Sequence, residues 1–170
     1  MLKITILFLS LTLAGCAAPR PPIKMVSQFN EDEIAWSKGK GTGSLSGAAL
    51  IQTQGGIPRT CAGRQVGLIP AATYSSERMF ALYANQMKGF TRAFMANRVE
   101  EPTIQYTQSI RMTTCDAQGN FEFDGLPKGL YYVSTGVVWN MGNSVVSEGG
   151  YLMQRVSIND GERTKVVLAP

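Results

Sequence analysis

The sequence predicts an all-β protein, an antiparallel β-sandwich of about six to seven strands that carries a short helical insertion. Phe121 and Phe123 alternate with polar residues, which is the period of a strand with one buried face. Turn-forming residues at 116–119 and 125–129 bracket this strand. Helical spacing of apolar residues is confined to about 75–97, so we expect the helix to be an insertion into a β-fold.

Residues 1–15 are predicted to be a lipoprotein signal peptide. Lys3 supplies a positive start, and the apolar run over 4–13 is shorter than the roughly 20 residues that a transmembrane helix needs. The run ends in Leu13-Ala14-Gly15-Cys16, which resembles the lipobox of bacterial lipoproteins. The resemblance implies cleavage before Cys16, acylation of that cysteine and attachment to a membrane through lipid. An ordinary secretory signal with an unmodified Cys16 is the alternative.

The residues after the cysteine bear on localisation and on domain boundaries. Ala17, in place of aspartate, implies by the sorting rule of such lipoproteins the outer membrane of a Gram-negative cell, with the protein facing the periplasm. Residues 16–42 are rich in proline and glycine and are expected to be a flexible tether, with a short helical turn over 31–36. The remaining residues, 43–170, are long enough for one domain with a single core.

Two cysteines remain once Cys16 is assigned to the lipid. In an oxidising compartment an even pair predicts a disulfide, here between Cys61 and Cys115. In the chain-entropy model such a crosslink stabilises the fold by about 4 kcal/mol. The sequence has no histidine and no CxxC pair, so we expect no zinc site.

The strands follow from alternation and turn signals. The strand at Phe121 and a return strand that begins at Tyr131 are expected to pair as an antiparallel unit, and Asn159-Asp160-Gly161 predicts a second hairpin. The polar loop over 140–150 is expected to display a binding surface. The other expected strands, apart from these two at the centre, are 42–53, 61–70, 102–114, 151–158 and 163–168.

The helical insertion at about 75–97 is the source of the candidate interaction surface. Its apolar residues recur at steps of three and four and are expected to cover the sandwich, which leaves Arg78, Lys88 and Arg92 on the opposite face. A helix lying on a membrane surface, with these bases toward phosphates, is the alternative. The excess of basic residues over 59–98 indicates either anionic envelope partners or an ordinary solvated surface. The apolar residues are Phe80, Tyr83, Met87, Phe90 and Phe94.

A family resemblance rests on the central segment. The run CDAQGNFEFDGLPKGLYYV from Cys115 resembles the hallmark of carboxypeptidase regulatory-like domains, which are small transthyretin-like sandwiches. The run VGLIPAATYSSER from Val66 resembles a segment of bacterial exported members of that group. The resemblance covers most of residues 43–168 and implies an accessory, binding or structural module. The histidines on which transthyretin-like hydrolases depend are missing here.

The sequence offers little for catalysis, and we predict no catalytic residue, cofactor or metal site. Without histidine, the usual base for a serine or cysteine nucleophile is missing. The oxygens of Asp116, Asn120 and Asp124 fit a turn better than a calcium loop. The aromatic residues Tyr131, Tyr132 and Trp139 are expected in the core, and the alternative is that an exposed one stacks on a sugar ring.

The sequence therefore predicts a non-catalytic, lipid-anchored envelope protein that acts as a binding module for a protein or a cell-wall polymer. Its membrane contact would be the lipid on Cys16, and the export signal argues against nucleic acid as a partner. The alternative is a structural subunit of an envelope-spanning assembly. The type VI secretion lipoprotein is similar in being an acylated transthyretin-like sandwich with extra helices.

Overall fold

The computed structural model describes residues 21–140, 142 and 146–170, and this part of the chain contains nine strands and four short helices. The signal peptide and the acylated Cys16 that the sequence predicts lie outside the described residues. No helix within the described ranges is long and apolar enough to cross a bilayer. The helices are η1 (Asp32–Lys38), α1 (Thr73–Tyr83), η2 (Ala93–Met95) and α2 (Ile104–Ser109), the two labelled η being 3-10 helices. The strands are β1 (Gly43–Gln52), β2 (Pro58–Thr60), β3 (Gln65–Pro70), β4 (Lys88–Arg92), β5 (Arg111–Thr114), β6 (Asn120–Leu126), β7 (Gly129–Asn140), β8 (Ser147–Ile158) and β9 (Arg163–Leu168).

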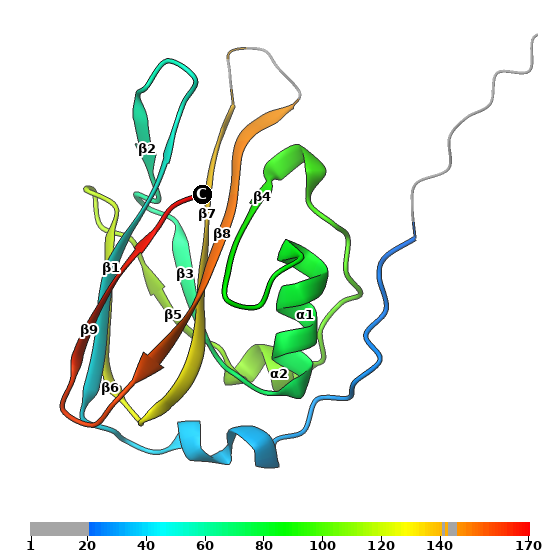
Figure 1. The fold of residues 1–170 in the computed structure, drawn as a ribbon, viewed down its shortest axis with the longest axis vertical. Helices are drawn as coiled ribbons and strands as arrows, with labels where there is room; N and C mark the ends of the chain where they lie inside the picture. Colours follow the sequence, from blue (N-terminus) through cyan, green and yellow to red (C-terminus); the bar gives the residue numbers. More distant parts are fainter. Residues whose placement is uncertain (1–20, 141, 143–145) are drawn as a thin grey trace, which may run out of the picture.

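Two sheets pack face to face (Figure 1). The first has the order β2-β1-β6, and β9 pairs with β1 as well. The second has the order β4-β8-β7-β3-β5. The pairing of β9 with β1 is parallel, and the other strand pairs are antiparallel. The fold class that the sequence predicts is thus confirmed, with more strands than the six to seven expected.

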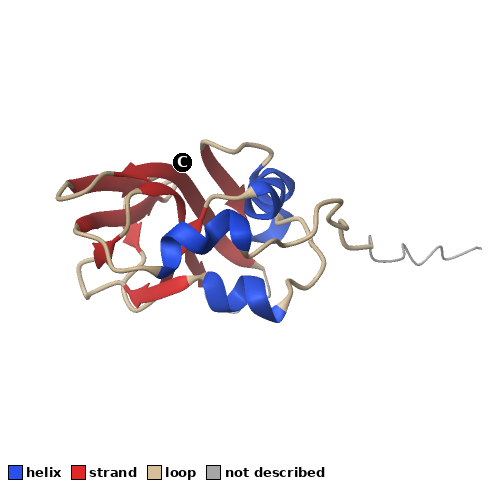
Figure 2. Cartoon of the chain, turned by 90° about the horizontal axis from the view of Figure 1, so that it is seen from below, coloured by secondary structure: helices blue, strands red, loops and turns tan. Residues whose placement is uncertain are grey.

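The second sheet has a core against each of its faces, one between the sheets and the other under the helices. Along β7, Tyr131 and Val133 belong to the core between the sheets, whereas Tyr132 belongs to the second core. Figure 2 shows the helices gathered on one side of the strands. There Tyr74 of α1 and Tyr106 of α2 pack against Tyr132. Each large apolar side chain that is fully buried in this way contributes about 1.5–3 kcal/mol.

One end of the sandwich is plugged by η1. Its Ile34 is buried, and the ring of Trp36 packs edge-on against Tyr131, with ring centroids 5.1 Å apart. A Cβ at Gly129 would lie 2.1 Å from the Trp36 ring, so only glycine lets the ring approach the start of β7. This is the end where β6 leads into β7, at the bottom of Figure 1. The η1 helix confirms the helical turn expected near 31–36.

The N-terminal segment is packed over residues 21–42, contrary to the flexible tether expected for 16–42. Ile23 forms a parallel bridge with Val99, and the Met25 amide donates to the Glu100 carboxylate at 2.9 Å. Phe29 makes edge-on ring contacts with Tyr74 and Tyr106, at centroid distances of 6.0 and 5.8 Å. Both tyrosines belong to the core under the helices, which we call the helix-side core. The composition predicted a tether because prolines and glycines are common here. The apolar residues between them nevertheless pack against the folded domain.

Glu77 of α1 holds the same segment. Its carboxylate accepts the amides of Val26 at 2.6 Å and Ser27 at 2.8 Å, together with the Ser27 hydroxyl. The Ser27 hydroxyl bond and the two amide bonds hold the pKa of Glu77 below its ordinary value of 4.5, because all three favour the charged carboxylate.

The two expected hairpins are wrong, although their turns are right. Strand β6 pairs with β1 and β7 pairs with β3 and β8, so the turn at 127–128 carries the chain from one sheet to the other. In the same way β8 ends in the second sheet, and β9 joins β1 in the first. The backbone N–H of Gly161, at φ 69°, donates to the Thr42 hydroxyl at 2.8 Å, so the turn at 159–161 exists but serves a crossover.

The expected helix over about 75–97 is helix only in its first part. α1 ends at Tyr83, its C-cap residue Ala84 has a left-handed φ of 55°, and β4 then pairs with the edge of β8. Gly89 of β4 lies against the last turn of α1, where a Cβ would be 2.4 Å from the Cβ of Tyr83. Apolar spacing alone could not distinguish one long helix from a helix followed by a strand that packs on it.

The expected strand over 102–114 is also half wrong, because its first part is α2. The Thr103 hydroxyl accepts the Tyr106 amide at 3.2 Å, which is the N-cap bond that begins the helix. Strand β5 then starts at Arg111. The expected loop over 140–150 is shorter than predicted, because β7 runs to Asn140 and β8 starts at Ser147.

The predicted disulfide is confirmed. Cys61 follows β2 and Cys115 follows β5, so the bond joins the two sheets across 54 residues of chain, with the Cα atoms 5.8 Å apart. Both cysteines are buried in the core between the sheets.

Replacing both cysteines with alanine is expected to lower the free energy of unfolding by about 4 kcal/mol, because the unfolded chain regains the entropy that the crosslink removes. Urea unfolding of the exported chain and of the Cys61→Ala/Cys115→Ala variant measures this difference. Unfolding the unaltered chain with a reductant present should reproduce the loss. Equal midpoints for oxidised and reduced chains would contradict the prediction.

Acid is expected to loosen the N-terminal segment at Val26 and Ser27. Because the pKa of Glu77 is lowered in the folded protein, its charged carboxylate stabilises the docked segment above pH 4.5. This stabilisation is lost as the pH falls through the lowered pKa. Protection of the Val26 and Ser27 amides against hydrogen exchange should therefore fall in that acid range. Protection of the Ala71 amide, which donates to the Leu130 carbonyl, should not. A Glu77→Gln variant should show reduced protection at Val26 and Ser27 without this pH dependence.

Candidate functional site

The end of the sandwich opposite the Trp36 plug is open. A groove of about 570 Å³ lies there between the β1–β2 end of the first sheet and the β4, β7 and β8 ends of the second. The β1–β2 connection, the end of β7 and the start of β8 lie at this end, at the top of Figure 1. We call this surface the mouth groove, and its main side chains are Arg59, Phe90, Arg92, Phe94, Trp139 and Glu148.

Two adjacent glycines make room for the aromatic rings of the groove. At Gly149, φ is +83° and a Cβ would lie 2.1 Å from the Val137 carbonyl oxygen and 2.5 Å from the Trp139 ring. At Gly150, a Cβ would lie 2.6 Å from the Phe90 ring. The backbone of β8 therefore forms a surface without side chains under both rings, which a residue with a Cβ would push away.

The groove combines half-buried aromatic rings with exposed polar and charged groups. Trp139 and Phe90 pack at the margin of the core between the sheets, while Phe94 is 55% exposed. The guanidinium of Arg59 lies over the Trp139 ring, 6.0 Å from its centroid, in a cation–π contact. Ring faces next to hydrogen-bonding side chains suit a ligand with an apolar face and a polar rim.

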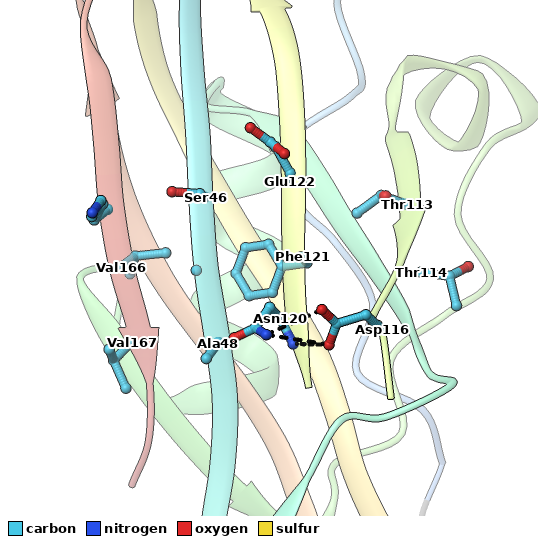
Figure 3. A pocket seen from close by; sticks show the side chains of 12 residues that line it. Ser46, Ala48, Thr113, Thr114, Asp116, Asn120, Phe121, Glu122, Val166 and Val167 are labelled. Atoms are coloured by element: carbon cyan, nitrogen blue, oxygen red, sulfur yellow. Dashed lines mark hydrogen bonds between the residues drawn. The ribbon is translucent and has the colours of Figure 1, made fainter. Parts of the chain in front are cut away.

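A second hollow lies on the outer side of the first sheet, between it and β5 (Figure 3). Small side chains such as Ser46 and Ala48 line it, and its aromatic residue, Phe121, is buried. Asp116 accepts the amides of Gln118 and Asn120, at 2.9 and 2.8 Å, and the Asn120 side chain as well. These bonds, the Asn120 amide first, hold the pKa of Asp116 below its ordinary value. The carboxylate is thus committed to the turn, as predicted, and this hollow is the weaker candidate.

The candidate surface of Arg78, Lys88 and Arg92 is not formed as predicted. Arg92 is exposed and lines the mouth groove, and Lys88 lies beside it, donating to the carbonyl of Pro170 at 3.4 Å. Arg78 is buried instead in the helix-side core, so it shares no surface with them. Phe80 of α1 is 58% exposed, although its spacing in the sequence predicted that it would face the sandwich.

Aromatic rings explain why Arg78 faces inward. Its guanidinium lies 5.7 Å from the Tyr74 ring centroid and 5.5 Å from that of Tyr106, and it donates to the Glu100 carbonyl at 2.9 Å. Burial raises the pKa of Tyr106 to about 12, so the phenol stays neutral beside this cation. Helical periodicity that assigns every arginine to the solvent-exposed face of a helix cannot predict such a buried position. With Arg78 inside, the helix also lacks the basic face that the membrane-surface alternative required.

Sequence reasoning missed most of the mouth groove. Arg59 and Glu148 carried no motif, and Phe94 was assigned to a covered helix face. Trp139 was assigned to the core, with sugar stacking by an exposed ring as the alternative. The available signal was the glycine pair 149–150 on the strand that follows Trp139, since adjacent glycines in a strand often mark a close approach of another group.

Comparisons with known proteins bear on the fold and on the kind of function. No family model matches the chain, and no curated protein matches it. A solved structure from Pseudomonas aeruginosa, described as a "putative carbohydrate binding protein", superposes on it with a TM-score of 0.69 and 25% sequence identity, covering 85% of this chain and 99% of that one. The similarity supports the sandwich fold and is compatible with a non-catalytic binding module.

A methyl group at Gly149 is expected to disrupt the groove and to destabilise the domain. Gly149→Ala should lower the free energy of unfolding by at least ~3 kcal/mol, because the left-handed backbone costs ~1–2 kcal/mol and the contact with Val137 adds more. Gly161→Ala is the matched control, since its φ is +69° and no atom lies within 4 Å of the added Cβ. Gly161→Ala should lower the free energy of unfolding only by the ~1–2 kcal/mol that the left-handed backbone costs. Equal losses in urea unfolding, with unchanged Trp139 fluorescence, would contradict the prediction.

Proposed function

We propose that this protein is a lipid-anchored, non-catalytic envelope protein that binds carbohydrate, such as a cell-wall polymer, in the mouth groove. The observation that carries the proposal is the arrangement of Trp139, Phe90 and Phe94 beside exposed charged side chains at the open end of the sandwich. The described function of the superposed Pseudomonas aeruginosa protein supports the same ligand class.

The chemistry of a sugar matches what the groove offers. A pyranose ring has faces of C–H groups that pack on aromatic rings, and a rim of hydroxyls that need hydrogen-bonding partners. Trp139 and Phe94 offer the rings, and Glu148 offers a carboxylate that accepts hydrogen bonds from hydroxyls. Gln52 and Thr53, at the end of β1, add side chains that both donate and accept. An open groove also accommodates a chain that continues past both ends of the bound segment.

The anchor and the location are proposed from the sequence. The order of charge, apolar run, small residues and Cys16 supports acylation, and Ala17 supports the outer membrane with the domain on the periplasmic side. The buried disulfide fits an oxidising compartment. A protein with these properties would hold a polysaccharide near the membrane without changing it chemically.

Binding should depend on Phe94 and not on an equally exposed phenylalanine elsewhere. The chain is purified with Cys16→Ser so that no lipid is attached, and its binding is measured on an array of bacterial polysaccharides and on isolated cell wall. Loss of ring stacking in Phe94→Ala should weaken binding about tenfold, by analogy with aromatic stacking worth ~1–3 kcal/mol. Phe80→Ala, which removes a ring of similar exposure from α1, is the matched control and should bind normally.

A second substitution separates binding from folding. Trp139→Phe keeps an aromatic ring but loses area and the indole N–H, so affinity should fall while the unfolding midpoint moves little. The proposed function is wrong if no polysaccharide binds the unaltered chain, or if Phe80→Ala and Phe94→Ala weaken binding equally.

A further inference from the structure

We propose that the mouth groove selects acidic glycans, whose sugars carry carboxylate or phosphate groups, and that Arg59 and Arg92 are the residues that select them. This inference rests on the proposed function and names the chemical class of its ligand.

The two arginines enter the groove from different sheets. Arg59 belongs to β2 of the first sheet, and Arg92 is the last residue of β4 in the second sheet, opposite Gly150 of β8. Both line the groove and both are exposed. A ligand that lies between the sheets on the aromatic rings is therefore within reach of a cation from either wall.

Neither arginine forms an ion pair with a residue that the structure describes. Within the described ranges the ion pair found is Lys38–Glu31, which is far from the groove in the fold. Other arginines use their donors internally: Arg64 donates to the Val138 carbonyl at 2.8 Å, and Arg111 donates to the Asp124 carbonyl at 2.6 Å. The described residues give Arg59 a ring contact with Trp139 and give the Arg92 side chain no hydrogen bond.

The contact between Arg59 and Trp139 also positions the charge. A guanidinium held over an indole face has lost part of its rotamer freedom, so less entropy is lost when a ligand binds it. The same contact holds the cation at the Trp139 ring, in the groove that Phe94 also lines, so a sugar that packs on Phe94 and on the edge of the indole meets it there. A charged group at the edge of that sugar is then close to a guanidinium when the ring contact is made.

Charge and geometry favour an anionic ligand over a neutral one. The planar fork of guanidinium donors matches the two oxygens of a carboxylate or a phosphate, and such charge-assisted bonds are about twice as strong as neutral ones. Glu148 is the acidic side chain in the groove, so two arginines outweigh it, and Lys88 lies beside the groove at Pro170. Glu148 remains available for sugar hydroxyls.

The test compares one carbohydrate chain with and without its charge. Calorimetric titration of the Cys16→Ser chain would use an oligogalacturonate and its methyl ester, and a mannose oligosaccharide with and without phosphate. We expect at least one acid to bind about tenfold or more tightly than its own uncharged counterpart, with affinity falling as salt rises. Binding of the carboxylate or of the phosphate identifies which acid the groove prefers, and either supports the proposal.

Charge-matched variants assign the effect to the two arginines. Arg59→Gln/Arg92→Gln should lose most of the preference for the acid over its uncharged counterpart, whereas Arg98→Gln/Arg163→Gln, which removes two exposed arginines outside the groove, should keep it. The inference is overturned if neither acid binds more tightly than its uncharged counterpart, or if both double variants behave alike. If Phe94→Ala still weakens binding about tenfold in that case, the proposed function stands without this inference. If no glycan binds the unaltered chain, both fall.

Discussion

The structure depends on β7, which is buried on both faces and paired along both edges. Its alternate residues enter different cores, Tyr131 and Val133 between the sheets and Tyr132 under the helices. Strands β3 and β8 satisfy its backbone on either side, so it has little freedom to shift register. Because β7 starts under the Trp36 plug and carries Trp139 near its other end, it also fixes which end of the sandwich is closed and which end presents a groove.

Local chemistry was enough to predict much of this fold. The Asp116 turn, the strand at Phe121 and the first strand appear where the sequence places them, since each depends on side chains close in the chain. The disulfide could be predicted because, once Cys16 is set aside, two cysteines allow a single pairing. The resemblance to carboxypeptidase regulatory-like domains implied the same sandwich from the central segment.

Partner choice and burial of charge could not be predicted in this way. Alternation shows which face of a strand is buried but not which strand pairs with it. The sequence therefore predicted a hairpin of β6 and β7, although the two strands belong to different sheets. Arg78 is buried because rings distant in the chain surround it. The mouth groove is assembled from five separate segments, so its residues share no spacing that a sequence pattern could reveal.

If Cys16 carries the proposed lipid, the packed N-terminal segment would limit the distance between the domain and the membrane. If residues 16–42 were free, the connection would extend to about 90 Å, but the first docked residue is Ile23, so only seven links remain, with a reach of about 24 Å. The domain would then stay within a thin layer next to the bilayer, and the groove could bind only polymer that lies in that layer. Releasing the contacts of Ile23, Met25 and Phe29 together with the Glu77 bonds would roughly double this reach without cutting the chain.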